Sequence, residues 1–130
     1  MAPTDTLLDR LERHIQACNN IASPAHLIPF RLGAEQVGWL GLDLARWLAF
    51  RPRDFHFDGQ GVGMAGRLRA AGARSLALDS AVQALASQGA LRHRGEAFDV
   101  RATPEGPVLA TLDRGALPSF GVISRGVHLN

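Results

Sequence analysis

Closely spaced turn signals are the feature that most restricts the fold of this chain. Asp58-Gly59 is a hairpin turn signal, and Gly95 and the Thr103–Gly106 segment mark two further turns. A pair of parallel strands needs a crossover connection of about a dozen residues or more, and most intervals here are shorter. The sequence therefore predicts an α+β fold with short, mainly antiparallel strands.

Apolar residues spaced three or four positions apart predict three helices. The predicted helices cover about residues 5–18, the segment from Leu40 to the break at Pro52, and about residues 76–88. Gly89 stands where a C-terminal cap is expected. Gly72 breaks the preceding segment, so residues 67–74 are left unassigned.

Short apolar segments between the turn signals predict the strands. They cover residues 29–33, 36–40, 55–57, 61–64, 91–93, 97–102 and 108–112, with 124–130 as a further candidate.

The size and composition of the chain predict one domain over residues 1–130. Apolar residues make up 46% and charged residues 20%, an ordinary balance for a globular protein. All 14 basic residues are arginines spread along the chain, and the formal net charge is only +2. Nucleic-acid binding needs positive charge gathered on one face, so this charge distribution does not favour a nucleic-acid partner.

The sequence shows no sign of secretion or of a membrane partner. No apolar run approaches the roughly 20 residues of a membrane span. The N-terminus has neither the basic nor the apolar region of a signal peptide. The single cysteine, Cys18, excludes an internal disulfide. We therefore expect a cytoplasmic location.

Five segments of the chain carry a family resemblance. They are His14–Asn20, Pro29–Gly33, Gln36–Leu40, Arg94–Val100 and Leu112–Asn130. Together and in this order they resemble the domain that precedes the Nudix catalytic domain in thiamine-pyrophosphokinase-related Nudix hydrolases. The resemblance implies an accessory domain, for substrate recognition or as a scaffold, whose partner is a Nudix domain in the same chain. It also implies that this partner hydrolyses diphosphates related to thiamine diphosphate, and that residues 121–130 form the junction.

The Nudix box, the catalytic motif of those hydrolases, has no counterpart in this sequence. The motif places several glutamates on one side of a helix, where they hold the Mg²⁺ ion that activates water. The four glutamates here are widely separated: Glu12, Glu35, Glu96 and Glu105. We therefore expect no catalytic residues in this chain, and Mg²⁺ only in the Nudix domain that the resemblance implies.

The Gly61–Gly66 segment matches the G-x-G-x-x-G pattern of dinucleotide sites, and Asp79 lies beyond it. Such a site needs the glycines between a buried parallel strand and a long helix. The preceding segment is short and half polar, which favours a glycine-rich hairpin instead.

Two sets of residues have the spacing of metal ligands. His14 and Cys18 lie four apart on the first predicted helix, and Asp54, His56 and Asp58 alternate along a strand. The first set lacks further ligands, and a solvated strand edge explains the second. No metal site is predicted.

Four residues are predicted to contact a substrate. Asn20 follows the first helix, where its amide either caps the helix or lines a pocket. Trp39 has glycine neighbours, and it is either a core residue or a contact for a ligand or the partner domain. Arg125 and His128 lie beside an apolar, strand-like run, either in water or within reach of a diphosphate.

A winged-helix module that binds nucleic acid is the alternative function. The third helix is followed by a strand and a basic turn, and Arg92, Arg94 and Arg101 would then contact phosphates. That helix offers only Gln83 and Gln88 for reading bases, which weakens this alternative.

Residues 120–130 are rich in apolar side chains. In the longer proteins of the resemblance, the following domain would cover this segment. An uncovered apolar strand favours pairing with another chain, so we predict a homodimer mediated in part by this segment. The competing outcome is a monomer whose tail folds into its own sheet.

Overall fold

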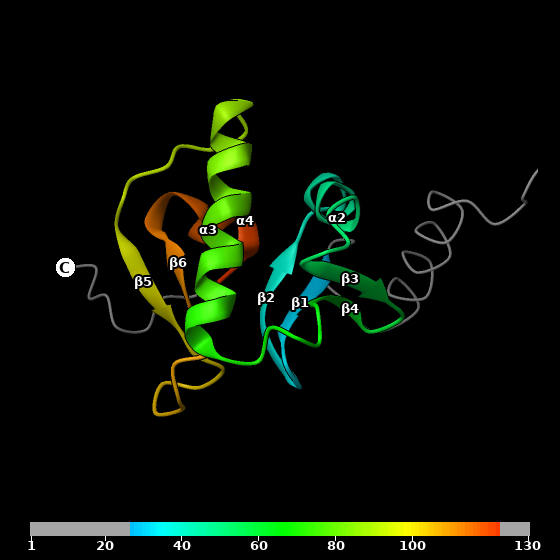
Figure 1. Cartoon of the computed structure of the whole chain (residues 1–130), viewed down its shortest axis with the longest axis vertical. Coiled ribbons are helices and arrows are strands. Elements are labelled where there is room, and N and C mark those ends of the chain that lie inside the picture. The colour runs from blue at the N-terminus through cyan, green and yellow to red at the C-terminus, as the bar shows by residue number, and fades with distance from the viewer. Residues whose placement is uncertain (1–26, 123–130) are drawn as a thin grey trace, which may run out of the picture.

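A computed structural model describes residues 27–122 of the chain, and the predicted helix at about 5–18 and the candidate strand at 124–130 lie outside them. The described strands are β1 (Ile28–Leu32), β2 (Glu35–Leu40), β3 (Phe55–Asp58), β4 (Gly61–Met64), β5 (Ala97–Val100) and β6 (Ala110–Asp113) (Figure 1). The described helices are α2 (Leu42–Ala49), α3 (Ala71–Ser87) and α4 (Leu117–Phe120), with a 3-10 turn at Arg114–Ala116 before α4.

Two hairpins build a four-stranded sheet in the order β2-β1-β4-β3. Strands β1 and β2 pair antiparallel, as do β3 and β4. The hairpins join through a parallel pairing of β1 with β4, where Phe30 lies opposite Val62. Residues 33–60 provide the long connection that a parallel pair requires. The prediction of an α+β fold with mainly antiparallel strands is confirmed.

The second half of the fold is a helix packed on a hairpin. Strands β5 and β6 pair antiparallel, and α3 lies along β6. Figure 1 shows this half beside the four-stranded sheet and α2. In the described residues, no helix is both long and apolar enough to cross a membrane.

One apolar core joins the two halves. The ring of Phe30 on β1 meets the ring of Phe120 on α4 edge to face, with centroids 5.2 Å apart. Both rings are completely buried. Other fully buried members come from both halves: Ile28, Leu40, Leu48, Val62, Leu78, Val82 and Leu112.

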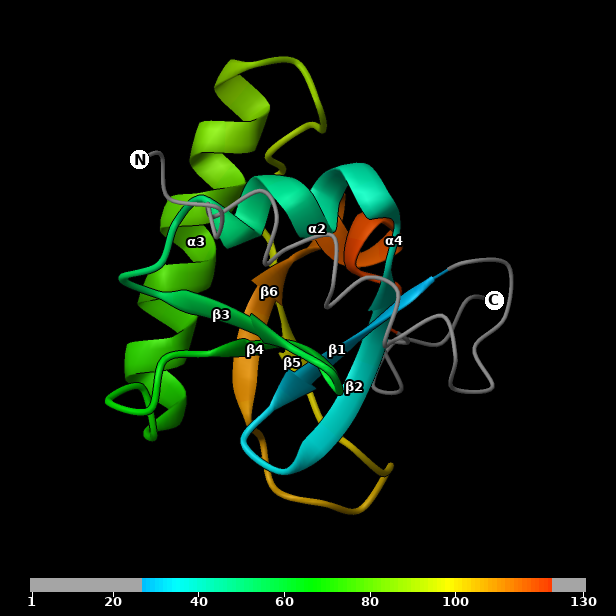
Figure 2. The ribbon, with the colours of Figure 1, turned by 90° about the vertical axis from the view of Figure 1, so that its right-hand side faces the viewer.

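The backbone after α4 packs directly on β2 (Figure 2). A Cβ atom at Gly38 would overlap the carbonyl oxygen of Phe120, and one at Gly121 would overlap the backbone of Trp39. Gly121 also has a φ of 62°, which favours glycine. Glycine is therefore required on both sides of this contact.

Two of the apolar residues assigned to the predicted dimer surface belong to the core instead. Phe120 is completely buried and Val122 is 7% exposed. They pack in the core because the contact of α4 with β2 covers them. Residues 123–130 lie outside the described part, so the homodimer stays a prediction.

The predicted start of α3 is wrong, and so is the strand predicted directly after the helix. The helix begins at Ala71, so Gly72 lies in its first turn and does not break it. The predicted strand at residues 91–93 is wrong, because the backbone N–H groups that follow it bind a carboxylate instead of a neighbouring strand. Gly89, with a φ of 80°, ends α3 as predicted.

Strands β5 and β6 are shorter than predicted. The segments expected at 97–102 and 108–112 meet only over Ala97–Val100 and Ala110–Asp113, and residues 101–109 form the loop between them. The helical turns at 114–120 were not predicted, although Pro118 near the start of α4 is a helix-start signal.

We predict that Gly38→Ala lowers the free energy of unfolding by roughly 3 kcal/mol, because its methyl group forces β2 away from Phe120. Urea denaturation measures the effect. Gly72→Ala is the matched control, since its Cβ would meet no atom within 4 Å. Equal stability of the two variants would show that the contact of α4 with β2 is not tight.

Candidate functional site

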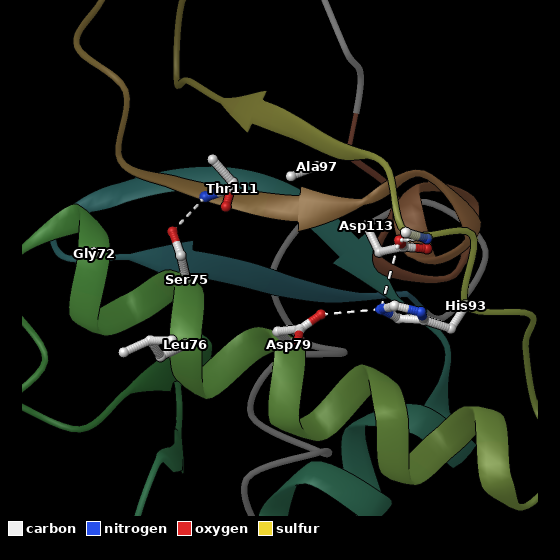
Figure 3. A pocket seen from close by; sticks show the side chains of 9 residues that line it. Gly72, Ser75, Leu76, Asp79, His93, Ala97, Thr111 and Asp113 are labelled. Atoms are coloured by element: carbon white, nitrogen blue, oxygen red, sulfur yellow. Dashed lines mark hydrogen bonds and ion pairs between the residues drawn. The ribbon is translucent and has the colours of Figure 1, made fainter.

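A pocket of about 390 Å³ lies between α3 and the β5–β6 hairpin (Figure 3). One wall comes from one face of α3 and the other from β5, β6 and the segment that leads into β5. The lining residues are Gly72, Ser75, Leu76, Asp79, His93, Gly95, Ala97, Thr111 and Asp113.

His93 lies between two carboxylates at one end of this pocket. Its Nε2 atom is 3.1 Å from Oδ1 of Asp79 on α3 and 3.7 Å from Oδ1 of Asp113 on β6 (Figure 3). Asp79 also accepts a hydrogen bond of 2.6 Å from Gln83, one helical turn further along. His93 therefore connects the two walls of the pocket.

Asp113 is the only buried polar or charged side chain among residues 27–122, with 6% exposed. Its Oδ1 accepts from the N–H groups of Gly95 at 2.7 Å and Glu96 at 3.1 Å. Its Oδ2 accepts from those of Arg94 and Gly115, both at 2.8 Å. This carboxylate therefore fixes the segment before β5 against the 3-10 turn after β6.

These contacts determine the charge of Asp113. Burial acts to raise the pKa of its carboxyl group, because a low dielectric disfavours the ion. The four backbone hydrogen bonds favour the ion and outweigh burial, so the pKa lies below its ordinary value of 3.8. Asp113 is therefore a carboxylate at neutral pH.

The hydroxyl of Ser75 serves the fold. Its Oγ donates to the carbonyl oxygen of Ala71 at 2.7 Å and accepts from the N–H of Thr111 at 2.8 Å. His93 directs its Nε2 to carboxylates and not to this hydroxyl. Ser75, His93 and Asp79 therefore do not form a nucleophilic relay, which requires a hydrogen bond between the hydroxyl and the imidazole.

Metal ligands do not gather within residues 27–122, where no three His, Cys, Asp or Glu side chains are placed to hold an ion. Asp54 pairs with Arg67 at 2.8 Å, and His56 lies 3.8 Å from Asp58. The pair of His14 and Cys18 lies outside the described residues.

Trp39 lines a second, smaller cavity of about 190 Å³. The other lining residues are Gln36, Val37, Gly38, Arg101, Ala102 and Gly121. The Arg101 guanidinium is held by the carbonyl oxygen of Gly106 at 2.7 Å and by Asp99 at 3.2 Å. Trp39, Gln36 and Arg101 therefore border one cavity. The other predicted substrate contacts, Asn20, Arg125 and His128, lie outside the described residues, and all four roles stay predictions.

The glycine-rich motif forms the predicted hairpin. Gly61–Met64 is β4, whose backbone pairs with β3 on one side and with β1 on the other. A Cβ atom at Gly61 would overlap the backbone of Pro29. This glycine therefore serves sheet packing.

The sequence does not predict that Asp79, His93 and Asp113 lie close together in space. These residues are far apart in the sequence, and only the packing of α3 on β6 brings them together. The one local signal is Asp113-Arg-Gly115, because an aspartate often accepts the N–H of the residue two positions later.

We predict that Asp113→Asn lowers the free energy of unfolding at pH 7 by about 2 kcal/mol, because an amide has one acceptor oxygen for four N–H groups.

This effect should depend on pH. The folded pKa of Asp113 is depressed, so its stabilisation is present above the unfolded pKa. It is lost as the pH falls through the folded pKa, so wild type and variant should converge well below pH 4. Denaturation from pH 7 to well below pH 4 measures this difference in stability, with the exposed Asp99→Asn as control. A pH-independent difference would contradict this account.

Comparison with known proteins places the chain in a family. The sequence model of the family described as "Domain of unknown function (DUF4743)" matches residues 10–124. No curated protein matches the chain. Because the matched region covers most of the sequence and includes both cavities, this chain belongs to the family of domains of unknown function named DUF4743.

Proposed function

We propose that this chain is a non-catalytic recognition domain of a cytoplasmic Nudix-type hydrolase, and that it binds diphosphates related to thiamine diphosphate. The observation that carries the proposal is the cavity lined by Trp39, Gln36 and Arg101. The family resemblance of the sequence supplies the substrate class and the catalytic partner.

The three polar or aromatic residues that line this cavity suit a ring that carries phosphate. An indole face stacks on an aromatic ring, and cationic rings gain further attraction from its π system. A guanidinium pairs with phosphate oxygens. Whole ligands need roughly 300 Å³ or more, so a cavity of about 190 Å³ takes one ring or one phosphate group. The remainder of the ligand would reach outward.

The position of the cavity supports a role beside a second domain. Gly121 borders the cavity, and residues 123–130 follow it directly in the sequence. A Nudix domain that follows this segment would supply the Mg²⁺ ion and the hydrolytic carboxylates. The present chain would then hold one part of the substrate at the junction.

The winged-helix alternative has one favourable observation. Helix α3 is followed by the antiparallel β5–β6 hairpin, and Arg92 and Arg94 beside it are exposed. Salt-sensitive binding of duplex DNA that is lost in Arg92→Ala/Arg94→Ala would favour this function.

We predict that thiamine diphosphate quenches the fluorescence of Trp39. In Trp47→Phe, Trp39 is the only tryptophan and reports on the cavity. Thiamine without phosphates should bind about tenfold more weakly, because it brings no phosphate to the Arg101 guanidinium. Arg101→Ala in the same background should reduce the affinity for thiamine diphosphate to that of thiamine, and the exposed Arg92→Ala should not. No fluorescence change with millimolar thiamine diphosphate would reject the proposal.

A second prediction concerns hydrolysis. The purified chain in Mg²⁺ should release no phosphate from thiamine diphosphate, its oxidised forms or nucleotide sugars, because its four glutamates are too widely spaced for a Nudix box. Phosphate assays on stringently purified protein provide the measurement. Release that persists through purification would show that the chain is itself an enzyme.

A further inference from the structure

We infer that the pocket between α3 and the β5–β6 hairpin binds a small organic amine. This inference is independent of the proposed function, because it concerns another cavity and the opposite ligand charge. The pocket's volume of about 390 Å³ lies in the range of small-molecule sites. Its selectivity follows from the hydrogen-bonding capacity that its walls retain.

The carboxylate end of the pocket offers acceptors. The two oxygens of Asp79 accept from His93 and Gln83, and each keeps a further lone pair. The Asp79 side chain is 46% exposed, so these lone pairs are accessible. The donors nearby are already used, since His93 Nε2 faces the two carboxylates and the Gly95 N–H binds Asp113.

The hydroxyl end of the pocket also offers hydrogen-bond acceptors to a ligand. Ser75 commits its proton to the carbonyl oxygen of Ala71 and keeps one lone pair. The Thr111 hydroxyl can serve as donor or acceptor. A ligand that bridges both ends must therefore bring its own N–H or O–H donors.

Charge selects an ammonium among such donors. Asp113 is held as a carboxylate, and Asp79 adds a second negative charge on the opposite wall. Protonated His93 would offset one of these charges, and Arg114 pairs with Glu96 outside the pocket. Hydrogen bonds from a cation to a carboxylate are about twice as strong as neutral ones, and an anion would meet repulsion.

Apolar groups accommodate the body of the ligand. Leu76 on α3 leaves 76% of its surface exposed at the rim, an unusual position for a large aliphatic side chain. Ala97 and Gly72 line the pocket without filling it. A small ring or alkyl group that carries a primary amine matches this combination of an apolar rim and a carboxylate end.

Three probes with one common ring test the inference: benzylamine, benzyl alcohol and benzoate. Two-dimensional amide NMR of the full chain follows each titration. Benzylamine should shift the amides of Gly95, Ala97 and Thr111 saturably, benzyl alcohol should act more weakly, and benzoate should have no effect. The inference is overturned if benzoate binds as well as benzylamine, or if benzylamine shifts no amide of the pocket.

Two variants locate the contact. Asp79→Asn should weaken benzylamine binding about tenfold, and Asp58→Asn, the same change at the end of β3 and outside the pocket lining, should not. Leu76→Ala alters an exposed side chain and should weaken the binding of both benzylamine and benzyl alcohol without disturbing the fold. If Asp79→Asn is misfolded by NMR, Leu76→Ala decides. Unchanged affinity in the folded variants would overturn the inference.

Discussion

The half of the fold built from α3, β5 and β6 depends on the hydrogen bonds that the Asp113 carboxylate accepts. This carboxylate stands at the end of β6 and accepts four backbone N–H groups, from Arg94, Gly95, Glu96 and Gly115. These donors have no strand partner, so a neutral or shorter side chain would leave several of them without this hydrogen bond. The segment between α3 and β5 is therefore ordered by one side chain instead of a strand. This segment places His93 in the pocket, where the imidazole connects Asp79 on α3 with Asp113 on β6.

Two recesses of opposite chemical character result from this packing. On one side, His93 and Asp79 border the pocket for which we infer a ligand that donates hydrogen bonds and carries a positive charge. On the other side, the glycine-to-glycine contact between β2 and the end of α4 places Trp39 at the edge of a cavity with Arg101. The shared core through Phe30 and Phe120 holds both recesses on one body. The recognition role that we propose rests on these two recesses.

The sequence predicts the elements whose signals are local. The Asp58-Gly59 turn gives the β3–β4 hairpin, and the apolar spacing before Pro52 gives α2. The start of α3 escapes prediction, because packing on β6 overrides the penalty of Gly72. The contacts of Asp113 escape prediction for another reason. Three of its four donors lie 17 to 19 residues earlier in the sequence, and hydrogen bonds at such separation leave no periodic pattern. The role of Trp39 stays a prediction from the sequence, whereas the pocket of His93 follows only from the tertiary structure.

The most direct test of two separate recognition sites is a competition experiment by amide NMR, with thiamine diphosphate and benzylamine added singly and together. The account predicts two sets of shifts without overlap, one around Gln36, Trp39 and Gly121 and the other around Gly95 and Thr111. Because the two cavities share no lining residue, we also expect saturation with one ligand to leave the affinity for the other within about twofold. Displacement of one ligand by the other, or a single common set of shifts, would contradict the account.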